Sequence, residues 1–128
     1  MDQIAGAKFA TSWVEAWNAH DLDGILAHFS DDVVFTSPVA AQMLPESAGV
    51  LRGKAALRAY WAAGLARIPD LRFEVVAVYT GIDTLVLNYR NHVGGLVCEV
   101  LHFDGGLVVR GAGTYLSDDA AGASGVDG

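Results

Sequence analysis

Four residues of types suited to acid–base chemistry lie in one stretch of the sequence, between Thr84 and Phe103. A carboxyl group such as that of Glu99 can exchange a proton with a substrate, and a nearby arginine such as Arg90 favours the ionised form of a carboxyl. The amide of Asn88 can bind a substrate oxygen. Histidine is the side chain type suited to proton transfer near neutral pH, so His92 is a fourth candidate. Apolar residues surround all four, which is typical of a ligand pocket.

The pairing of two strands decides which of these side chains meet. Two β-rich runs flank the pair Gly94-Gly95, a pattern that predicts a two-residue hairpin turn. This register places Arg90 opposite Glu99. The alternative interpretation of that pair is a cross-strand ion pair that only stabilises the sheet, and the alternative for His92 is a solvated rim residue. Because strand side chains alternate, one face is predicted to hold Val86, Asn88, Arg90, His92, Val97, Glu99, Leu101 and Phe103.

Hydrophobic periodicity predicts the elements that position this hairpin. Helices are expected at 4–18, directly after Asp21, and at 53–68, and strands at 33–36, 71–80, on both sides of the hairpin turn, and at 107–116. The segment 39–51 is expected to be a loop, either a pocket lid or a contact with another subunit. Because helices and strands are segregated along the chain, an α+β fold is predicted, with helices over one face of a curved, mainly antiparallel sheet.

Composition limits the classes of function. The 128 residues suit one domain, with 1–117 expected to fold and 118–128 to form a disordered tail. A net charge of −7 argues against nucleic acid or an anionic membrane as a partner, and no apolar run is long enough to span a membrane. The single cysteine, Cys98, and the lack of an evident signal peptide predict a cytoplasmic location. No metal or cofactor motif is recognised, so none is expected.

Three patterns resemble a known family. They are EAWNAHDLDGILAHFSDDVVFTSPVA at 15–40, Gly53-x-x-Ala56-Leu57-Arg58-x-Tyr60, and His102-Phe103-Asp104-Gly105. Together they resemble the bacterial ketosteroid isomerases and the wider SnoaL-like, nuclear-transport-factor-2-like superfamily, over about residues 9–116. The resemblance implies a cone-like fold in which three N-terminal helices and a strongly curved sheet enclose an apolar pocket. It also implies a homodimer joined through the outer sheet face, where Leu87, Tyr89, Cys98 and Val100 are then expected.

The resemblance implies catalytic positions that this sequence only partly keeps. The isomerases use a carboxylate base, a tyrosine and a protonated aspartate, and these positions fall on Ser37, Trp13 and Glu99. Only Glu99 keeps a carboxyl group. The resemblance also turns the face of Glu99 inward, which makes the predicted pocket wall Trp13, Trp17, Phe35, Ser37, Tyr60, Trp61, Val86, Leu101, Phe103, Val109, Gly111 and Tyr115.

These observations lead to one hypothesis and two alternatives. The hypothesis is a protein that binds a small hydrophobic, oxygen-bearing metabolite and acts as a cofactor-independent isomerase, cyclase or hydratase. The first alternative is a non-catalytic binding or accessory protein, because one fold can host unrelated functions. The second is an epoxide hydrolase of the limonene type, which needs a second inward carboxylate that the sequence does not offer.

Overall fold

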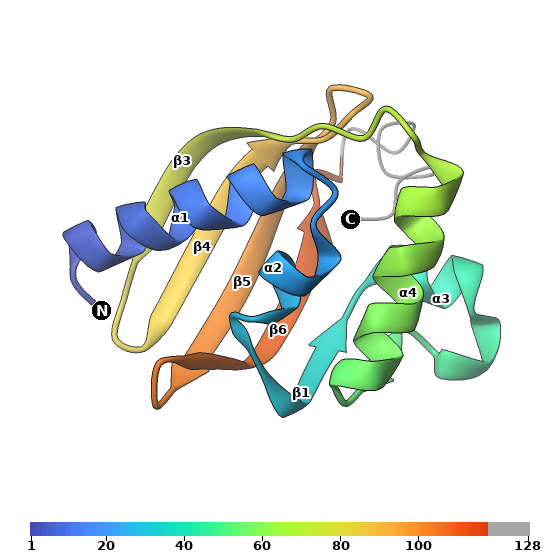
Figure 1. The fold of residues 1–128 in the computed structure, drawn as a ribbon, viewed down its shortest axis with the longest axis horizontal. Coiled ribbons are helices and arrows are strands. Elements are labelled where there is room, and N and C mark those ends of the chain that lie inside the picture. Colours follow the sequence, from blue (N-terminus) through green and yellow to red (C-terminus); the bar gives the residue numbers. More distant parts are fainter. Residues whose placement is uncertain (118–128) are drawn as a thin grey trace.

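The computed structural model describes residues 1–117 and has an α+β architecture, as predicted. A six-stranded sheet has the strand order β2-β1-β6-β5-β4-β3 (Figure 1). Strands β1 and β6 are parallel, and the other neighbours are antiparallel. The strands are β1 (Phe29–Thr36), β2 (Val50–Arg52), β3 (Glu74–Thr80), β4 (Thr84–Arg90), β5 (Leu96–Asp104) and β6 (Leu107–Tyr115). The helices are α1 (Gln3–Asn18), α2 (Leu22–Leu26), α3 (Pro38–Met43), the 3-10 helix η1 (Pro45–Ser47) and α4 (Lys54–Arg67).

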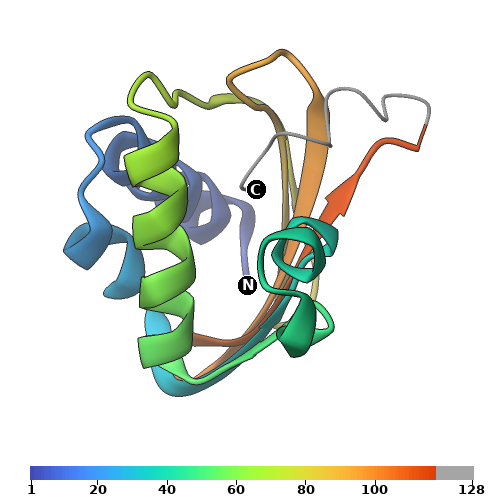
Figure 2. The same cartoon turned by 90° about the vertical axis from the view of Figure 1, so that its right-hand side faces the viewer.

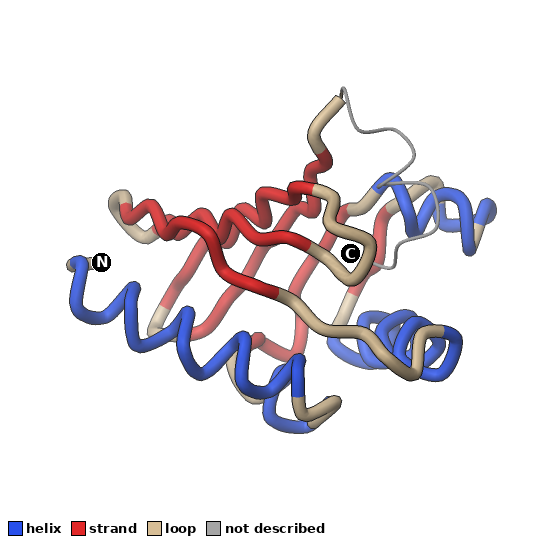
Figure 3. The backbone as a smooth tube through the Cα atoms, turned by 90° about the horizontal axis from the view of Figure 1, so that it is seen from above, coloured by secondary structure: helices blue, strands red, loops and turns tan. Residues whose placement is uncertain are grey.

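The sheet forms one layer and the helices form the other. Figures 2 and 3 show the sheet curving around α1, α2 and α4, which lie on its concave side. Helix α1 packs along β3, and α4 packs against β1 and β2. This arrangement is the cone-like fold that the resemblance implied, and it leaves the concave face of the sheet turned toward the helices.

Side chains at helix starts explain where two of the helices begin. Asp2 accepts a hydrogen bond from the backbone N–H of Ala5 at 2.8 Å, and Asp21 accepts one from the N–H of Gly24 at 3.0 Å. Such caps satisfy N–H groups that have no partner within the helix. At Gly24 an added Cβ would lie 2.5 Å from the carboxylate of Asp21, so a larger residue would displace the cap.

The predicted loop 39–51 is wrong, because most of this segment has regular structure. Ser37 accepts hydrogen bonds from the N–H groups of Val39 and Ala40, and Pro38 occupies the first turn of α3. Proline is favoured at that position because its missing N–H would have no helical partner. Helix α3, η1 and β2 are each six residues or fewer, too short for hydrophobic periodicity to reveal.

A second segment differs from the prediction because side chains take the place of strand pairing. Strand β3 begins at Glu74 and not at Leu71. The amide of Asn18 bonds the backbone of Phe73 at both ends, donating to its C=O at 3.0 Å and accepting from its N–H at 2.7 Å. His20 adds a contact of 2.9 Å between Nε2 and the C=O of Leu71. These bonds fasten the segment before β3 to the end of α1.

The core contains a large aromatic cluster and lies between the helices and the concave face of the sheet. Trp13, Trp17 and Trp61 are fully buried, and their rings touch in series with centroid separations of 6.5 Å and 5.1 Å. Phe73 stacks on Trp13 at 5.8 Å, and Tyr89 contacts both rings. Burial of such large apolar areas is the main stabilising contribution to a domain of this size. No helix within residues 1–117 combines the length and apolar character that crossing a membrane would require.

Candidate functional site

The hairpin between β4 and β5 has a different register from the predicted one. Arg90 pairs with Leu96, so that residues 91–95 form a five-residue connection in place of a two-residue turn. The side chain of Asn91 closes this connection, because its Oδ1 accepts from the N–H of Val93 at 3.1 Å and from that of Gly95 at 2.9 Å. Relative to the prediction the pairing moves by three positions. An odd shift turns every side chain of β4 to the opposite face.

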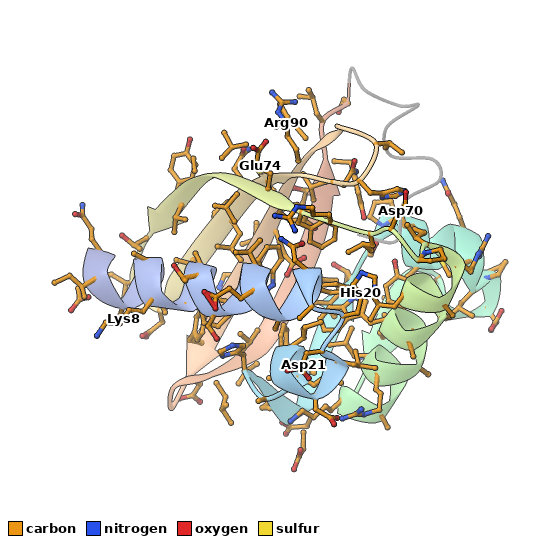
Figure 4. The ribbon with its side chains drawn as sticks, turned by 45° about the horizontal axis from the view of Figure 1, so that its top comes forward. Lys8, His20, Asp21, Asp70, Glu74 and Arg90 are labelled. Carbon is orange, nitrogen blue, oxygen red and sulfur yellow. The ribbon has the colours of Figure 1, made fainter. Side chains whose placement is uncertain are left out.

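The predicted pair of Arg90 and Glu99 is therefore wrong. Glu99 lies opposite Leu87, whereas Arg90 is exposed and donates from Nη1 to the C=O of Gly94 at 3.1 Å. Figure 4 shows Arg90 near Glu74 at the end of the sheet, away from α1 and α4. Arg90 therefore does not pair with the Glu99 carboxyl, and the role predicted for Arg90 beside Glu99 is wrong.

Asn88 and His92 also lie away from the predicted site. Asn88 lies on the convex face, where its Nδ2 approaches Sγ of Cys98 at 3.0 Å. His92 lies in the connection between β4 and β5, where it borders a groove of about 350 Å³ with Arg90, Asp70 and Glu74. This groove lies at the end of the sheet and is lined by side chains of both charges. Neither Asn88 nor His92 is therefore a partner of Glu99.

The inward position of Glu99 is confirmed, and the residue beside it is a tyrosine that sequence reasoning placed on the outer face. Glu99 is fully buried, and its Oε1 accepts a hydrogen bond of 3.5 Å from the hydroxyl of Tyr89. The rest of its face on β4 and β5 is apolar and includes Leu87, Val97 and Leu101. The sequence could have identified Tyr89 as the partner of Glu99 only through a prediction of the five-residue connection, and Asn91 was the residue that indicated it.

A row of residues across three strands links Glu99 to Ser37. Glu99 pairs with Gly113 on β6, and Gly113 lies beside Ser37 at the end of β1. A Cβ added at Gly113 would have Ser37 as its nearest neighbour, at 3.8 Å, so a methyl group would fit there in ordinary van der Waals contact. Neighbouring strands are about 4.8 Å apart. Glu99 and Ser37 therefore lie on opposite sides of Gly113, each one strand spacing away from it.

Ser37 is a helix cap whose hydroxyl also meets a tyrosine of α4. Its Oγ accepts from the N–H of Val39 at 3.1 Å, and it lies 3.5 Å from the hydroxyl of Tyr60 on α4. Both side chains are buried. A serine cannot replace a carboxylate as a general base, but a serine and a tyrosine can donate hydrogen bonds to a substrate oxygen.

Three further donors lie within the aromatic core. The indole N–H groups of Trp13, Trp17 and Trp61 are buried and have no hydrogen-bond acceptor within residues 1–117. A buried donor without an acceptor costs about 1–3 kcal/mol, and a whole domain is stable by only about 5–15 kcal/mol.

The other predicted pocket residues fall into two groups. Val86 lies on the convex face opposite Val100, and Val109 is bypassed by a bulge that places Val108 in the core, so both predictions are wrong. Phe103 packs against Phe9 at 5.2 Å at the margin of the core. The remaining predicted residues lie in the buried interior or pack against it: Trp13, Trp17, Phe35, Ser37, Tyr60, Trp61, Leu101, Gly111 and Tyr115.

The electrostatic character of the interior is defined by one carboxyl group. The buried polar or charged residues of the described chain are Ser37, Asn91 and Glu99, so no lysine or arginine is among them. No three His, Cys, Asp or Glu side chains within residues 1–117 group as the ligands of a metal ion would. The arrangement combines one carboxyl group, two hydroxyl groups and aromatic walls.

Comparison with known proteins agrees with this architecture. The SnoaL-like domain family matches residues 10–115. A SnoaL-like protein of unknown function from Burkholderia thailandensis is 41% identical, with a TM-score of 0.87, over 91% of this chain and 98% of that one. None of the curated proteins matches the sequence. The chain belongs to the SnoaL-like family.

Two more distant structures share the fold. AclR, a putative hydroxylase from Streptomyces galilaeus, is 23% identical with a TM-score of 0.71, over 90% of this chain and 91% of that one. TerC, which was co-crystallised with polyporic acid, is 13% identical with a TM-score of 0.72, over 92% of this chain and 96% of that one. At these identities the likeness concerns the fold alone.

Proposed function

We propose that this protein binds a small apolar, oxygen-bearing metabolite between its helices and its sheet, and that Glu99 exchanges a proton with it. The observation that carries the proposal is the complete burial of Glu99 on the concave face, beside Gly113, which has space for a methyl group but carries no side chain. Burying a carboxyl group is costly, and such groups persist mainly where they have partners or a task.

The reaction class follows from the groups around that position. A carboxylate can remove a proton from a carbon next to a carbonyl group and return it to another carbon, which isomerises the substrate without any co-reactant. The hydroxyls of Ser37 and Tyr60, on the other side of Gly113, are suited to stabilise the enolate oxygen that forms meanwhile. Cyclisation and hydration need the same proton transfers. A fold neighbour that is a putative hydroxylase and one crystallised with an organic acid support small-molecule chemistry in this fold.

The second candidate function is ligand binding without catalysis. Ser37 and Trp13 stand at two of the three positions where the isomerases carry catalytic groups, and Ser37 already serves as the cap of α3. An epoxide hydrolase of the limonene type is disfavoured, because Glu99 is the only buried carboxylate among residues 1–117.

Two wider assignments belong to the proposal as well. A cytoplasmic location is consistent with the lone Cys98. A homodimer is consistent with the convex face of the sheet, where Val86, Val100 and Ala112 form an apolar row. Two of the residues predicted for the outer face, Leu87 and Tyr89, point into the core and do not belong to this row.

Hydrogen exchange at carbon tests the proposed chemistry without knowledge of the natural substrate. The probe is 1-tetralone in D₂O, whose protons next to the carbonyl exchange only when a base removes them. We expect wild-type protein to accelerate this exchange and Glu99→Gln to lose the acceleration while unfolding at a similar temperature. Glu74→Gln, which alters an exposed carboxylate on β3, is the matched control and should keep full activity. Equal exchange by wild type and Glu99→Gln would remove Glu99 from the reaction.

A further inference from the structure

A groove on the outer side of the helix layer contains a serine that is hydrogen-bonded to a histidine. The groove has a volume of about 650 Å³ and lies along α1 and α2, which pack against each other (Figure 1). Small side chains such as Ala16 and Ala19 line it. Ser12 lines it as well, whereas Trp13, the next residue on α1, is buried in the core. The groove is therefore separate from the interior that contains Glu99.

The hydroxyl of Ser12 is directed to the ring of His28. Its Oγ lies 3.1 Å from Nε2 of His28, which follows α2 in the chain. Thr11 shows the usual alternative on a helix, because its hydroxyl donates to the backbone C=O of Ala7 at 3.1 Å. Ser12 makes no such backbone bond within residues 1–117, so its hydroxyl hydrogen is available to the imidazole. A hydroxyl beside a neutral imidazole is the arrangement of a nucleophile and its general base.

The surroundings of His28 fix its position and favour its neutral form. Its backbone C=O accepts a hydrogen bond of 2.9 Å from the N–H of Val108, and its ring contacts that of Phe9 at 4.6 Å. The side chain is half-buried, and this burial lowers the pKa of His28 below its ordinary value of 6.5. At pH 7.5 the ring is therefore an unprotonated base, and its Nε2 can accept the proton of Ser12.

The charged side chains of the groove favour a neutral substrate. Lys8 lies one helical turn before Ser12 on the same face of α1, and its ammonium group can stabilise negative charge on a substrate oxygen. Glu15 follows Ser12 on α1, and Asp21 lies at the start of α2. Figure 4 shows Lys8 on α1 and Asp21 at α2. Because the groove has more carboxylates than ammonium groups, it disfavours an anionic substrate.

We propose that Ser12 and His28 form a second reactive site, which hydrolyses small neutral carboxylic esters in the groove between α1 and α2. Oγ of Ser12 attacks the carbonyl carbon of the ester while Nε2 of His28 takes up the hydroxyl proton. The bond from that carbon to the alcohol oxygen then breaks, and the leaving oxygen receives the proton from His28. Water attacks the acyl-serine in the same way, gives a proton to His28, and the proton returns to Oγ of Ser12 as the carboxylic acid leaves.

Turnover of p-nitrophenyl acetate tests this site, because the probe is small and neutral and releases a coloured phenolate. The probe also acetylates exposed amines once each, so the steady rate after that initial phase is the quantity to measure. We expect Ser12→Ala and His28→Gln each to lower this rate about 100-fold, the lower end of what a general base contributes. Ser12 is exposed and alanine favours a helix, so Ser12→Ala should fold as wild type does.

A second contact between a hydroxyl and a histidine, outside the groove, provides the matched control. Oγ1 of Thr84 lies 3.4 Å from Nδ1 of His102, but it already donates to the C=O of Ile82 at 3.0 Å. His102→Gln should therefore keep the wild-type rate.

Labelling with a fluorophosphonate, which reacts with activated serines, identifies the nucleophile directly. Peptide mass spectrometry should find the label on Ser12 in wild-type protein, and at least about tenfold slower labelling in His28→Gln, which lacks the general base. Wild-type turnover no faster than that of Ser12→Ala, an equal loss of rate in His102→Gln, or a fluorophosphonate that leaves Ser12 unlabelled would each overturn the inference.

Discussion

Gly113 on β6 is the cross-strand neighbour of Glu99, and a methyl group at this position would have no neighbour closer than 3.8 Å. Two residues earlier on the same strand, Gly111 is different, because a Cβ there would lie 2.7 Å from Cδ2 of Phe35. Gly111 thus allows Phe35 to pack against the sheet, whereas Gly113 leaves room for a methyl group beside a buried carboxyl. The two positions offer a direct comparison between a packing glycine and a site glycine.

Replacing Gly113 with alanine should leave the fold intact and impair binding. The nearest atoms to the new methyl are 3.8 Å away, and alanine restricts the unfolded chain more than glycine does, so stability should stay level or rise by about 0.4–1 kcal/mol. Affinity for 1-tetralone should fall, because the methyl occupies space beside Glu99. Urea unfolding and titration of the probe measure the two effects.

Gly111→Ala is the matched variant on the same strand. Its methyl would meet Phe35 and Leu101 at 3.1 Å or less, and overpacking of this kind costs about 1–3 kcal/mol. A Gly113→Ala protein that loses as much stability as Gly111→Ala would show that the position over Gly113 is filled in solution, which would contradict its assignment to the site.

Asn18 should be important for stability and not for ligand selection. Asn18→Ala leaves both the N–H and the C=O of Phe73 without their side-chain partner, at a cost of about 1–3 kcal/mol in the free energy of unfolding. Thr11→Ala, which removes an exposed bond to Ala7 in the same helix, is the control and should change stability by no more than about 0.5 kcal/mol. Equal stability of the two variants in urea would show that the Asn18 clamp contributes nothing.

His28 should make the protein less stable at acidic pH. Burial lowers the pKa of His28 below the ordinary value of 6.5, because a charged imidazolium loses solvation beside the ring of Phe9. The unfolded chain then takes up this proton more readily than the folded one. The stability that neutral His28 contributes is therefore fully present above pH 6.5 and is lost as the pH falls below it.

The variant His28→Gln isolates this contribution. Glutamine does not titrate and can still bond Ser12, whose Oγ lies 3.1 Å from Nε2 of His28. The free energy of unfolding, measured in urea at pH 7.5 and pH 5.5, should fall less on acidification in the variant than in wild type. An identical fall in both proteins would show that His28 takes up its proton equally well in the folded state.

The sequence determined the fold more fully than it determined the site. Long amphipathic helices, the cap at Asp21 and the inward position of Glu99 were all predicted correctly. The partners of Glu99 were not, because they depend on the length of one connection, and glycine pairs suit both a two-residue turn and a longer loop. Asn91 settled that choice through two hydrogen bonds that are visible only in three dimensions.

A similar limit applies to the short elements and to the residues of the resembling motif. Helix α3 and β2 are too short to leave a periodic pattern, and Ser37, which the resemblance aligned with the base of the isomerases, caps α3. Asn18 and Asp21 belong to the most recognisable run of the resemblance, yet both hold backbone in place. The residues that identify the family therefore build the fold and carry little information about the ligand.

The convex face of the sheet should carry the dimer contact. Val100 pairs with Val86 on one side and with Ala112 on the other, and this apolar row is bordered by rows with polar side chains such as His102 and Thr114. Apolar rows with polar borders are typical of subunit interfaces. Val100→Asp would place a charge at the centre of the face, so we expect it to shift the protein from dimer to monomer in light scattering after size-exclusion chromatography. Val76→Asp changes an exposed position on β3, near the edge of the same sheet, and should leave the mass unchanged. Wild-type protein that elutes as a monomer, or a Val100→Asp protein that stays dimeric, would place any interface elsewhere, and the apolar row would then need another partner.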